Sequence, residues 1–333
     1  MYFEGGDRMV NFKDRKILLI APNFYEYHTQ IIKVLENKNS RVTFVSEMSE
    51  TLLYRIFRKI SPRLKKYLEK RHVDKIIYQT SIIEFNYVFV IRGGCLTSNS
   101  MEKIKANLPH AHFLMYQWDS LKQNNYLPII DFFHVTKTFD RSDAAFLNID
   151  YLPLFYSEKY KNIKKIKSFK KYDLIFVGAQ HSDRYKIIKD LCFFLSKNEL
   201  KFKVHLYIKL LPLMRELITQ RISFRDLRFF KIYRLSTNDI VNLYSKSKAV
   251  LDIELNIQNG LSIRTFEALA GGMKLITTNK NITKELFYDP ESIMIIKRND
   301  IHFDINFFNK KNNPSKLIEK YGIDEWIYFL FGD

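Results

Sequence analysis

The chain has 333 residues, is 46% hydrophobic and carries a formal net charge of +18 at pH 7. At about 150 residues per domain, this length predicts two domains with sizeable cores. No apolar run approaches the roughly 18 residues of a membrane-spanning helix, and the start lacks the pattern of a signal peptide. Two cysteines, Cys95 and Cys192, exclude a disulfide framework, and we expect buried thiols in a reducing cytoplasm.

Three basic stretches, at 55–71, 159–171 and 215–234, carry much of the charge. The charge allows three kinds of anionic partner: nucleic acid, an anionic membrane face, or phosphorylated small molecules. Ile, Leu, Phe and Tyr interrupt the stretches, as in amphipathic surface helices, so a merely solvated face is the alternative for any one of them. The three stretches together favour an anionic partner.

The first half of the chain alternates short buried strands with helices. Apolar runs predict strands at 16–20, 41–45, 87–91, 112–116 and 132–135. Helical patterns predict helices at about 25–36, 52–75 and 101–107. This rhythm predicts a doubly wound parallel sheet, an α/β fold.

A second cycle of strands and helices follows the lysine-rich stretch. Strands are predicted at 173–177, 203–207, 249–253 and 274–277, and helices from about 183, at 239–247 and at 314–321. We expect domains at 9–153 and 173–310, joined by a basic linker at 154–172. A C-terminal helix and tail at 311–333 can pack back on the first domain. The first eight residues resemble a cloning remnant, with Met9 as the expected natural start.

The segment 259–279, NGLSIRTFEALAGGMKLITTN, carries the clearest chemical signal. It predicts a loop, a short helix, a double-glycine stop and a strand. It follows a buried strand, and open α/β sheets bind ligands at the carboxyl ends of their strands. Gly260 lets the loop approach a ligand closely, and Ser262 is a candidate N-cap. The first-turn amides and the helix dipole favour an anion. These first-turn residues are Ile263, Arg264 and Thr265.

Two charged side chains on this short helix suit a nucleoside diphosphate. Arg264 offers a fork that matches phosphate oxygens. Glu267 lies three residues later on the same face and can accept hydrogen bonds from both ribose hydroxyls. The end of the next strand, with Thr278 and Asn279, reaches the same crevice. The alternative is that Arg264 and Glu267 pair on an exposed helix face.

Further cationic candidates follow two other strands of the second half. His181, Asp183 and Arg184 follow Gly178 at a strand-to-helix turn, where Arg184 suits a phosphate. The alternative is a capping Asp183 with Arg184 in solvent. Lys209 ends another strand and can add charge beside the diphosphate, or be a solvated lysine.

Asp119 ends a strand of the first half and is a candidate general base for an acceptor hydroxyl. A helix cap or turn aspartate is the alternative. The motifs G-x-G-x-x-G and G-x-x-x-x-G-K-[ST] are both absent, which argues against a dinucleotide oxidoreductase or a P-loop enzyme. The acidic pair Asp252 and Glu254 is weak support for a bound cation.

The GLSIRTFEALAGG core resembles the donor-site signature of GT-B glycosyltransferases. It is most similar to the CgeB-like and family-4-like bacterial enzymes that build surface polysaccharides. Weaker similarity covers the rest of the chain, in DLIFVGAQHSDR at 173–184, QWDS at 117–120 and FDRSD at 139–143. The resemblance implies a GT-B fold, with two Rossmann-like domains whose parallel sheets face a central cleft.

The resemblance also implies roles for individual residues. Glu267 would bind the donor ribose, Arg264 and the amides of 262–265 would face the diphosphate, and 277–280 would line the pocket. His28 follows the first strand, where some inverting enzymes keep their base; a surface histidine is the alternative. Asn259 departs from the retaining pattern, which has a second Glu eight positions before Glu267, so the stereochemistry stays open.

The resulting hypothesis is a cytoplasmic glycosyltransferase that needs no metal or other cofactor. It would move a sugar from a nucleoside diphosphate, with UDP favoured, to a glycan or lipid-linked glycan in bacterial capsule or lipopolysaccharide synthesis. The basic surface would hold it peripherally at the anionic inner face of the membrane. One alternative is a nucleic-acid-binding protein, although no helix-turn-helix, RNA-recognition or zinc-finger pattern is present. Another is a nucleotide-sugar epimerase or phosphorylase of the same fold.

Overall fold

The computed structural model describes residues 10–332 except 24–25 and 313–314. The proposed cloning remnant, Met9, and the expected helix starts at Tyr25 and Pro314 lie outside these residues. The chain divides into two compact units. The first comprises Met1–Pro153 and Ile323–Asp333, and the second comprises Leu154–Gly322.

The first unit is built on a six-stranded parallel sheet with the order β2-β1-β3-β4-β5-β6. Its strands are β1 (Lys16–Ala21), β2 (Arg41–Ser46), β3 (Tyr87–Ile91), β4 (His112–Gln117), β5 (Val135–Thr138) and β6 (Asp150–Tyr151). The central strands are apolar without alternation because helices cover both faces of the sheet. The expected strand at 132–135 is displaced, since a 3₁₀ helix, η1 (Leu127–Phe132), precedes β5.

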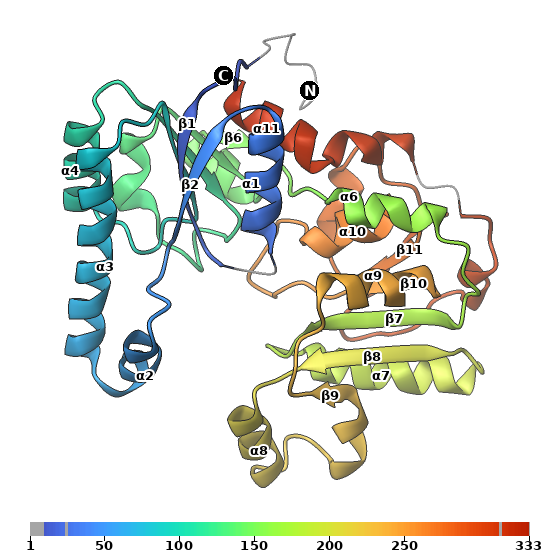
Figure 1. Cartoon of the computed structure of the whole chain (residues 1–333). Helices are drawn as coiled ribbons and strands as arrows, with labels where there is room; N and C mark the ends of the chain where they lie inside the picture. The colour runs from blue at the N-terminus through green and yellow to red at the C-terminus, as the bar shows by residue number, and fades with distance from the viewer. Residues whose placement is uncertain (1–9, 24–25, 313–314, 333) are drawn as a thin grey trace. The chain divides into compact units, whose positions relative to one another are not determined.

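Helices α3 and α4 cover one face of this sheet, and α1 and α11 cover the other (Figure 1). The helices are α1 (Tyr27–Asn37), α2 (Leu52–Ile60), α3 (Pro62–Ile82), α4 (Ser98–Asn107), α5 (Arg141–Leu147) and α11 (Ile323–Phe331). The single helix expected at 52–75 is broken because Pro62 starts a new one, which Ser61 caps. The C-terminal segment joins this core, where the rings of Trp326 and Tyr116 form a T-shaped pair with centroids 4.7 Å apart.

The second unit has a six-stranded parallel sheet with the order β12-β11-β10-β7-β8-β9. Its strands are β7 (Tyr172–Ala179), β8 (Phe202–Tyr207), β9 (Phe230–Lys231), β10 (Ser247–Asp252), β11 (Lys274–Thr277) and β12 (Ile293–Ile295). Its α-helices are α6 (Glu158–Lys161), α7 (Arg184–Lys197), α8 (Leu210–Ile218), α9 (Thr237–Ser245) and α10 (Ile263–Ala270). The 3₁₀ helices are η2 (Asn162–Lys165), η3 (Phe224–Phe229), η4 (Lys280–Lys284), η5 (Ile305–Phe308) and η6 (Lys316–Tyr321).

The chain runs outward from β7 to β8 and β9, then returns to β10 and runs the other way to β11 and β12. Such a reversal opens a crevice at the carboxyl ends of the two central strands, β7 and β10. Residues 154–172, for which the sequence predicts a linker, group with this unit. Within them Tyr160 packs against Tyr244 of α9, with ring centroids 5.8 Å apart.

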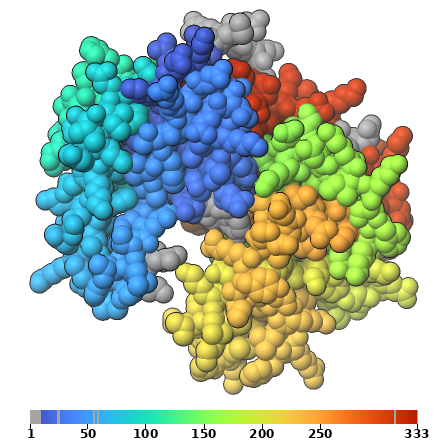
Figure 2. Space-filling view, viewed as in Figure 1, coloured from blue at the N-terminus to red at the C-terminus, as the bar shows by residue number. Residues whose placement is uncertain are grey.

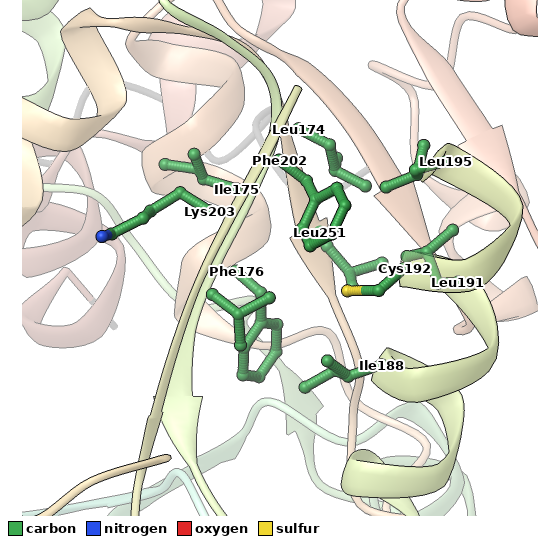
Figure 3. Close-up of a pocket in the computed structure, with 11 residues that line it drawn as sticks. Leu174, Ile175, Phe176, Ile188, Leu191, Cys192, Leu195, Phe202, Lys203 and Leu251 are labelled. Atoms are coloured by element: carbon green, nitrogen blue, oxygen red, sulfur yellow. The ribbon is translucent and has the colours of Figure 1, made fainter. Parts of the chain in front are cut away.

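A small cavity lies between α7 and the strands β7 and β8 (Figure 3). Its lining is almost wholly apolar, and the one charged side chain, Lys203, points away from it. Its volume of about 10 Å³ is close to the minimum for one water molecule. It is therefore a packing defect of the core and not a ligand pocket. Among the described residues, no helix is long and apolar enough to span a membrane.

Candidate functional site

Asp252, the last residue of β10, fixes the start of α10. Its side chain is 1% exposed and accepts hydrogen bonds from the hydroxyls of Ser262 at 2.7 Å and Thr265 at 3.0 Å. Ser262 is the N-cap residue, as its position in the sequence predicts, but its hydroxyl is turned to Asp252 and does not cap the helix. The first-turn amides of α10 therefore stand at the carboxyl end of β10, where the helix dipole favours an anion.

Arg264 is fixed by the same aspartate. Its Nη1 lies 2.7 Å from Asp252 Oδ1, and its guanidinium lies 5.5 Å from the ring centroid of Phe176. The buried hydroxyl of Tyr244 lies near enough to interact with its charge. Burial alone would lower the pKa of Arg264, but Asp252, Tyr244 and Glu267 together raise it above its ordinary value. Arg264 is a permanently charged, immobilised cation.

Glu267 lies one turn further along α10 and is 4% exposed. The sequence places it on the same face as Arg264, and the two are close enough for the carboxylate to stabilise the guanidinium charge. The alternative of an ion pair on an exposed helix face does not describe this arrangement, because all of α10 from Thr265 to Ala270 is buried.

Arg184 has a different environment from the one the sequence suggests. It is 7% exposed; its Nε donates to the main-chain oxygen of Ile253 at 2.9 Å, and its Nη1 donates to that of Ala179 at 2.8 Å. These carbonyls follow β10 and end β7, so Arg184 ties together the two strands of the crevice. Burial, together with the charge of Arg264, lowers the pKa of Arg184 to about 9. The alternative of a solvated side chain is wrong because Arg184 is buried, and its contact with a phosphate stays a prediction.

Arg298, which follows β12, is a third arginine at this edge. Its Nη1 lies 2.7 Å from Asp183 Oδ1, and its Nη2 lies 2.8 Å from Glu254 Oε1. Asp183 follows β7 and Glu254 follows β10, so one guanidinium joins the loops of three strands. Sequence reasoning missed Arg298 because it sits in a loop, KRND, that matches no motif. Asp183 is an ion-pair partner and makes no side-chain cap for α7.

His181 lies among these arginines, after β7. Burial, together with the charges of Arg184 and Arg264, lowers the pKa of His181 to about 3. Its imidazole is therefore neutral at pH 7, and can offer a hydrogen bond to a ligand without adding charge. Lys209 is the exposed N-cap residue of α8, which follows β8.

The loop before α10 is fastened to the end of β11. Asn279 is 4% exposed and donates to the main-chain oxygens of Gly260 at 3.1 Å and Asn259 at 3.4 Å. The Thr278 hydroxyl donates to the Glu254 carboxylate. The structure thus brings together the ends of β10 and β11, as their parallel pairing requires, and holds the main chain of 259–260 in place.

In the first unit, Asp119 belongs to a cluster that the sequence did not reveal. Arg92, after β3, lies 2.8 Å from Asp119 Oδ2 through its Nε and 2.7 Å from Glu47 Oε1 through its Nη1. Arg92 has a left-handed backbone, with φ of 70°, and its carbonyl accepts bonds from Gln117 and Asn124, each at 2.9 Å. Such strain persists where the surroundings impose it, as at functional sites.

The two carboxyl groups of this cluster resist ionisation. Burial raises the pKa of Glu47 to about 7, although Arg92 opposes the shift. Burial likewise raises the pKa of Asp119 against the pull of Arg92. His28 lies elsewhere on α1, where its ring stacks on Phe44 of β2 with centroids 4.5 Å apart. Burial lowers the pKa of His28 despite the nearby glutamates.

No group of three or more His, Cys, Asp or Glu side chains that could hold a metal ion occurs in the part of the chain that the structure describes. Asp252 and Glu254, the acidic pair that weakly suggests a cation, are each bound to an arginine. Two of the arginines that converge on β7 and β10, Arg264 and Arg298, are therefore paired with carboxylates, beside a helix start.

The comparisons with known proteins agree with this architecture. Residues 185–316, all within the second unit, match the family described as "Glycosyl transferase-like". No curated protein sequence matches the chain. Among solved structures, the apo form of the lipopolysaccharide outer core galactosyltransferase WaaB is 12% identical with a TM-score of 0.55, over 95% of this chain and 99% of that one.

Two further structures contain bound uridine nucleotides. UDP-GlcNAc 2-epimerase from Methanocaldococcus jannaschii, in complex with UDP-GlcNAc and UDP, is 12% identical with a TM-score of 0.55, over 94% of this chain and 98% of that one. HepE from Anabaena, in complex with UDP and glucose, is 9% identical with a TM-score of 0.54, over 94% and 93%. At these identities the likeness shows the fold.

The two parallel sheets and these comparisons define the class: a protein of GT-B fold. Residues 185–316 of its second unit match the glycosyltransferase-like family, and the carboxyl ends of β7 and β10 lie within the same unit.

Proposed function

We propose that the protein is a glycosyltransferase that moves a sugar from a nucleoside diphosphate, with UDP favoured, to a glycan or lipid-linked glycan. A role in bacterial capsule or lipopolysaccharide synthesis follows from the resemblance of the GLSIRTFEALAGG segment. One observation carries the proposal: Arg264, Glu267 and the start of α10 meet at the strand reversal of the second unit. The UDP complexes of proteins with the same fold support the choice of nucleotide.

In the proposed donor site, Glu267 accepts hydrogen bonds from the ribose hydroxyls. Arg264 and the amides of Ser262 and Ile263 face the diphosphate, while the Thr265 amide donates to the main-chain oxygen of Ser262 at 3.0 Å. Because Asp252 already immobilises Arg264, the cation needs no reorganisation as negative charge develops on the leaving group. The fixed positive charge of Arg264 and of the helix start is therefore the main contribution of the second unit to the rate enhancement.

Other residues position the site. Arg184 holds β7 and β10 together, and Asn279 holds the main chain of Asn259 and Gly260 where it can approach the donor. His181, with its neutral ring, is assigned a hydrogen bond to the donor. We assign Thr278 to the pocket wall and Lys209 to its electrostatic field.

The acceptor hydroxyl needs a base, and we assign that role to Asp119 in the first unit. Arg92 holds its carboxylate by a 2.8 Å contact, while burial raises its pKa toward the range useful for proton transfer. His28 is the second candidate, since burial keeps its imidazole neutral and able to accept a proton.

A ligand that binds only the folded protein raises its melting temperature, by an amount that grows with its concentration over Kd. A thermal-shift screen with UDP, GDP, CMP and their sugars tests the donor class. UDP and one UDP-sugar should stabilise the protein, while uridine without phosphates should not. A flat response to every nucleotide would reject the donor site.

A second candidate, a nucleotide-sugar epimerase, is favoured by one observation. The epimerase structure matches this fold as well as the galactosyltransferase does, with a TM-score of 0.55 for each. Incubation with the donor alone separates the two reactions. An epimerase converts the sugar without any acceptor, whereas a transferase releases UDP in proportion to glycosylated acceptor.

We also propose a cytoplasmic location with peripheral association at the anionic inner face of the membrane. The net charge of +18 supports it, because each Lys or Arg near such a surface contributes about 1 kcal/mol. A lipid-linked acceptor would be reached from this position.

A further inference from the structure

Helix α8 of the second unit carries one broad apolar face. One edge of this face packs into the core through Leu213, which is 9% exposed, and Leu217. The rest of the face is open to solvent, with exposed fractions of 54% for Leu210, 75% for Leu211, 49% for Met214 and 78% for Ile218. The spacing i, i+1, i+4 and i+8 puts these four side chains within about 100° of the helix circumference. An apolar stripe of this width normally faces a core or a partner surface.

A further exposed apolar side chain begins η3, the 3₁₀ helix that follows α8 in the chain. Phe224, its first residue, is 77% exposed. We call these five side chains the α8 patch: Leu210, Leu211, Met214, Ile218 and Phe224. The segment connects β8 to β9, the edge strand of the second sheet, and extends beyond that strand (Figure 1). In the space-filling view it lies at the surface (Figure 2, yellow).

The segment that carries the α8 patch is strongly basic. Residues 209–234 contain seven basic residues against two acidic ones, a net charge of +5. The basic residues are Lys209, Arg215, Arg221, Arg225, Arg228, Lys231 and Arg234. Both acids have partners: Glu216 lies 3.8 Å from Arg221 Nη1, and the buried Asp226 lies 3.3 Å from Lys189 Nζ.

We propose that the α8 patch inserts into the interfacial region of an anionic lipid bilayer. Leucine, isoleucine, methionine and phenylalanine side chains on one face of a helix enter the boundary between headgroups and acyl chains, and flanking arginines bind lipid phosphates. The net charge alone does not indicate which surface of the protein would contact the membrane, and the α8 patch would supply that contact. The identity of the cellular membrane that the patch would bind rests on the proposed function, whereas binding to an anionic bilayer does not.

Charge complementarity selects the bilayer over two other occupants. In a symmetric dimer through this patch, the same basic residues of both copies would face one another. A single-stranded nucleic acid is bound by aromatic faces on which bases stack, whereas four of the five patch side chains are aliphatic.

Vesicle co-sedimentation of the full-length protein tests the proposal. The probe is a vesicle with about 30% anionic phospholipid in phosphatidylcholine, at a fixed ionic strength of about 0.1 M. The double variant Leu211→Gln, Ile218→Gln should lower the partition coefficient at least ten-fold, since both side chains are at least 75% exposed and neither is needed for packing. The matched control, Phe169→Gln with Phe193→Gln, alters side chains 84% and 65% exposed elsewhere in the second unit and should bind like wild type.

A second variant tests the contribution of the basic side chains. At about five-fold per cation, Arg215→Gln with Arg225→Gln should weaken partitioning about twenty-five-fold on anionic vesicles, and wild type should bind poorly to neutral vesicles. An Ile218→Trp variant reports insertion: its emission should shift to the blue on anionic vesicles and be quenched by brominated acyl chains.

Three results would overturn the proposal. The first is unchanged partitioning of the Leu211→Gln, Ile218→Gln variant. The second is loss of partitioning only in Leu52→Gln with Ile60→Gln, which alters the exposed apolar face of α2. The third is dissociation of a dimer by the α8 variant with vesicle binding intact, which would make the patch a contact between copies. The affinity of the same variants for UDP should match that of wild type. If wild type binds vesicles but no nucleotide, the proposed function fails while membrane binding by the α8 patch stands.

Discussion

Replacing Asp252 by asparagine tests how the start of α10 is held. The carboxylate is 1% exposed and accepts from Arg264 and two hydroxyls at 2.7–3.0 Å. Asparagine keeps one oxygen for the hydroxyls but leaves the Arg264 charge, whose side chain is 16% exposed, without its counter-ion. Removing one partner of a buried ion pair costs about 3–5 kcal/mol, a large part of the ~5–15 kcal/mol that stabilises a protein.

Two further variants isolate the cause. Adding Arg264→Met removes the orphaned charge, so the double variant should be more stable than Asp252→Asn alone. Glu216→Gln, an acid-to-amide change in an exposed ion pair 3.8 Å long, should cost less than about 1 kcal/mol.

Urea denaturation combined with hydrogen exchange of the β10 and α10 amides gives the measurement, because the two units need not unfold together. A cost for Asp252→Asn no larger than that of Glu216→Gln, or no recovery in the double variant, would refute the reasoning.

Three more predictions concern the other charged groups. Burial raises the pKa of Glu47 to about 7 from its ordinary 4.5, so the unfolded carboxyl loses its proton first and the stability of the first unit should fall as pH rises between these values. Glu47→Gln should flatten that slope in pH-dependent denaturation; an unchanged slope would contradict it. Asp119→Asn should lower kcat about 10²–10⁴-fold in a UDP-release assay while the Kd for UDP stays the same, and full activity would exclude it as the base. Arg298→Lys keeps the charge but cannot span Asp183 and Glu254, which should cost about 1.5–3 kcal/mol in urea denaturation; a neutral effect would show that the bridge adds no stability.

The fold was largely predictable because its strands are buried on both faces. Continuous apolar runs such as LIFV at 174–177 have few alternatives in a chain of alternating elements. The predictions failed at short, local features. A two-residue edge strand such as β9 has no periodicity to detect, and the stretch at 127–135 contains enough apolar residues to resemble a strand although η1 occupies most of it.

Only the part of the candidate site that lies within a single segment of the sequence was predictable. The spacing of Arg264 and Glu267 within one helix follows from the sequence, and so does the position of Ser262 at its start. The partners of these residues come from other elements. Nothing local indicates that Arg298 bridges the loops after β7 and β10, or that Arg92 joins Glu47 to Asp119, because those contacts exist only after the strands pair.

The central claim is that Glu267 and the start of α10 hold the nucleoside diphosphate of the donor. Calorimetric titration of UDP into wild type and Glu267→Gln tests it most directly, with circular dichroism as the check on folding. Wild type should bind UDP, and the amide should weaken binding about 10–150-fold, as expected for losing a charged hydrogen bond worth ~1.5–3 kcal/mol. Glu267→Ala should bind no measurable UDP. Equal affinity of a folded Glu267→Gln variant and wild type would contradict the claim.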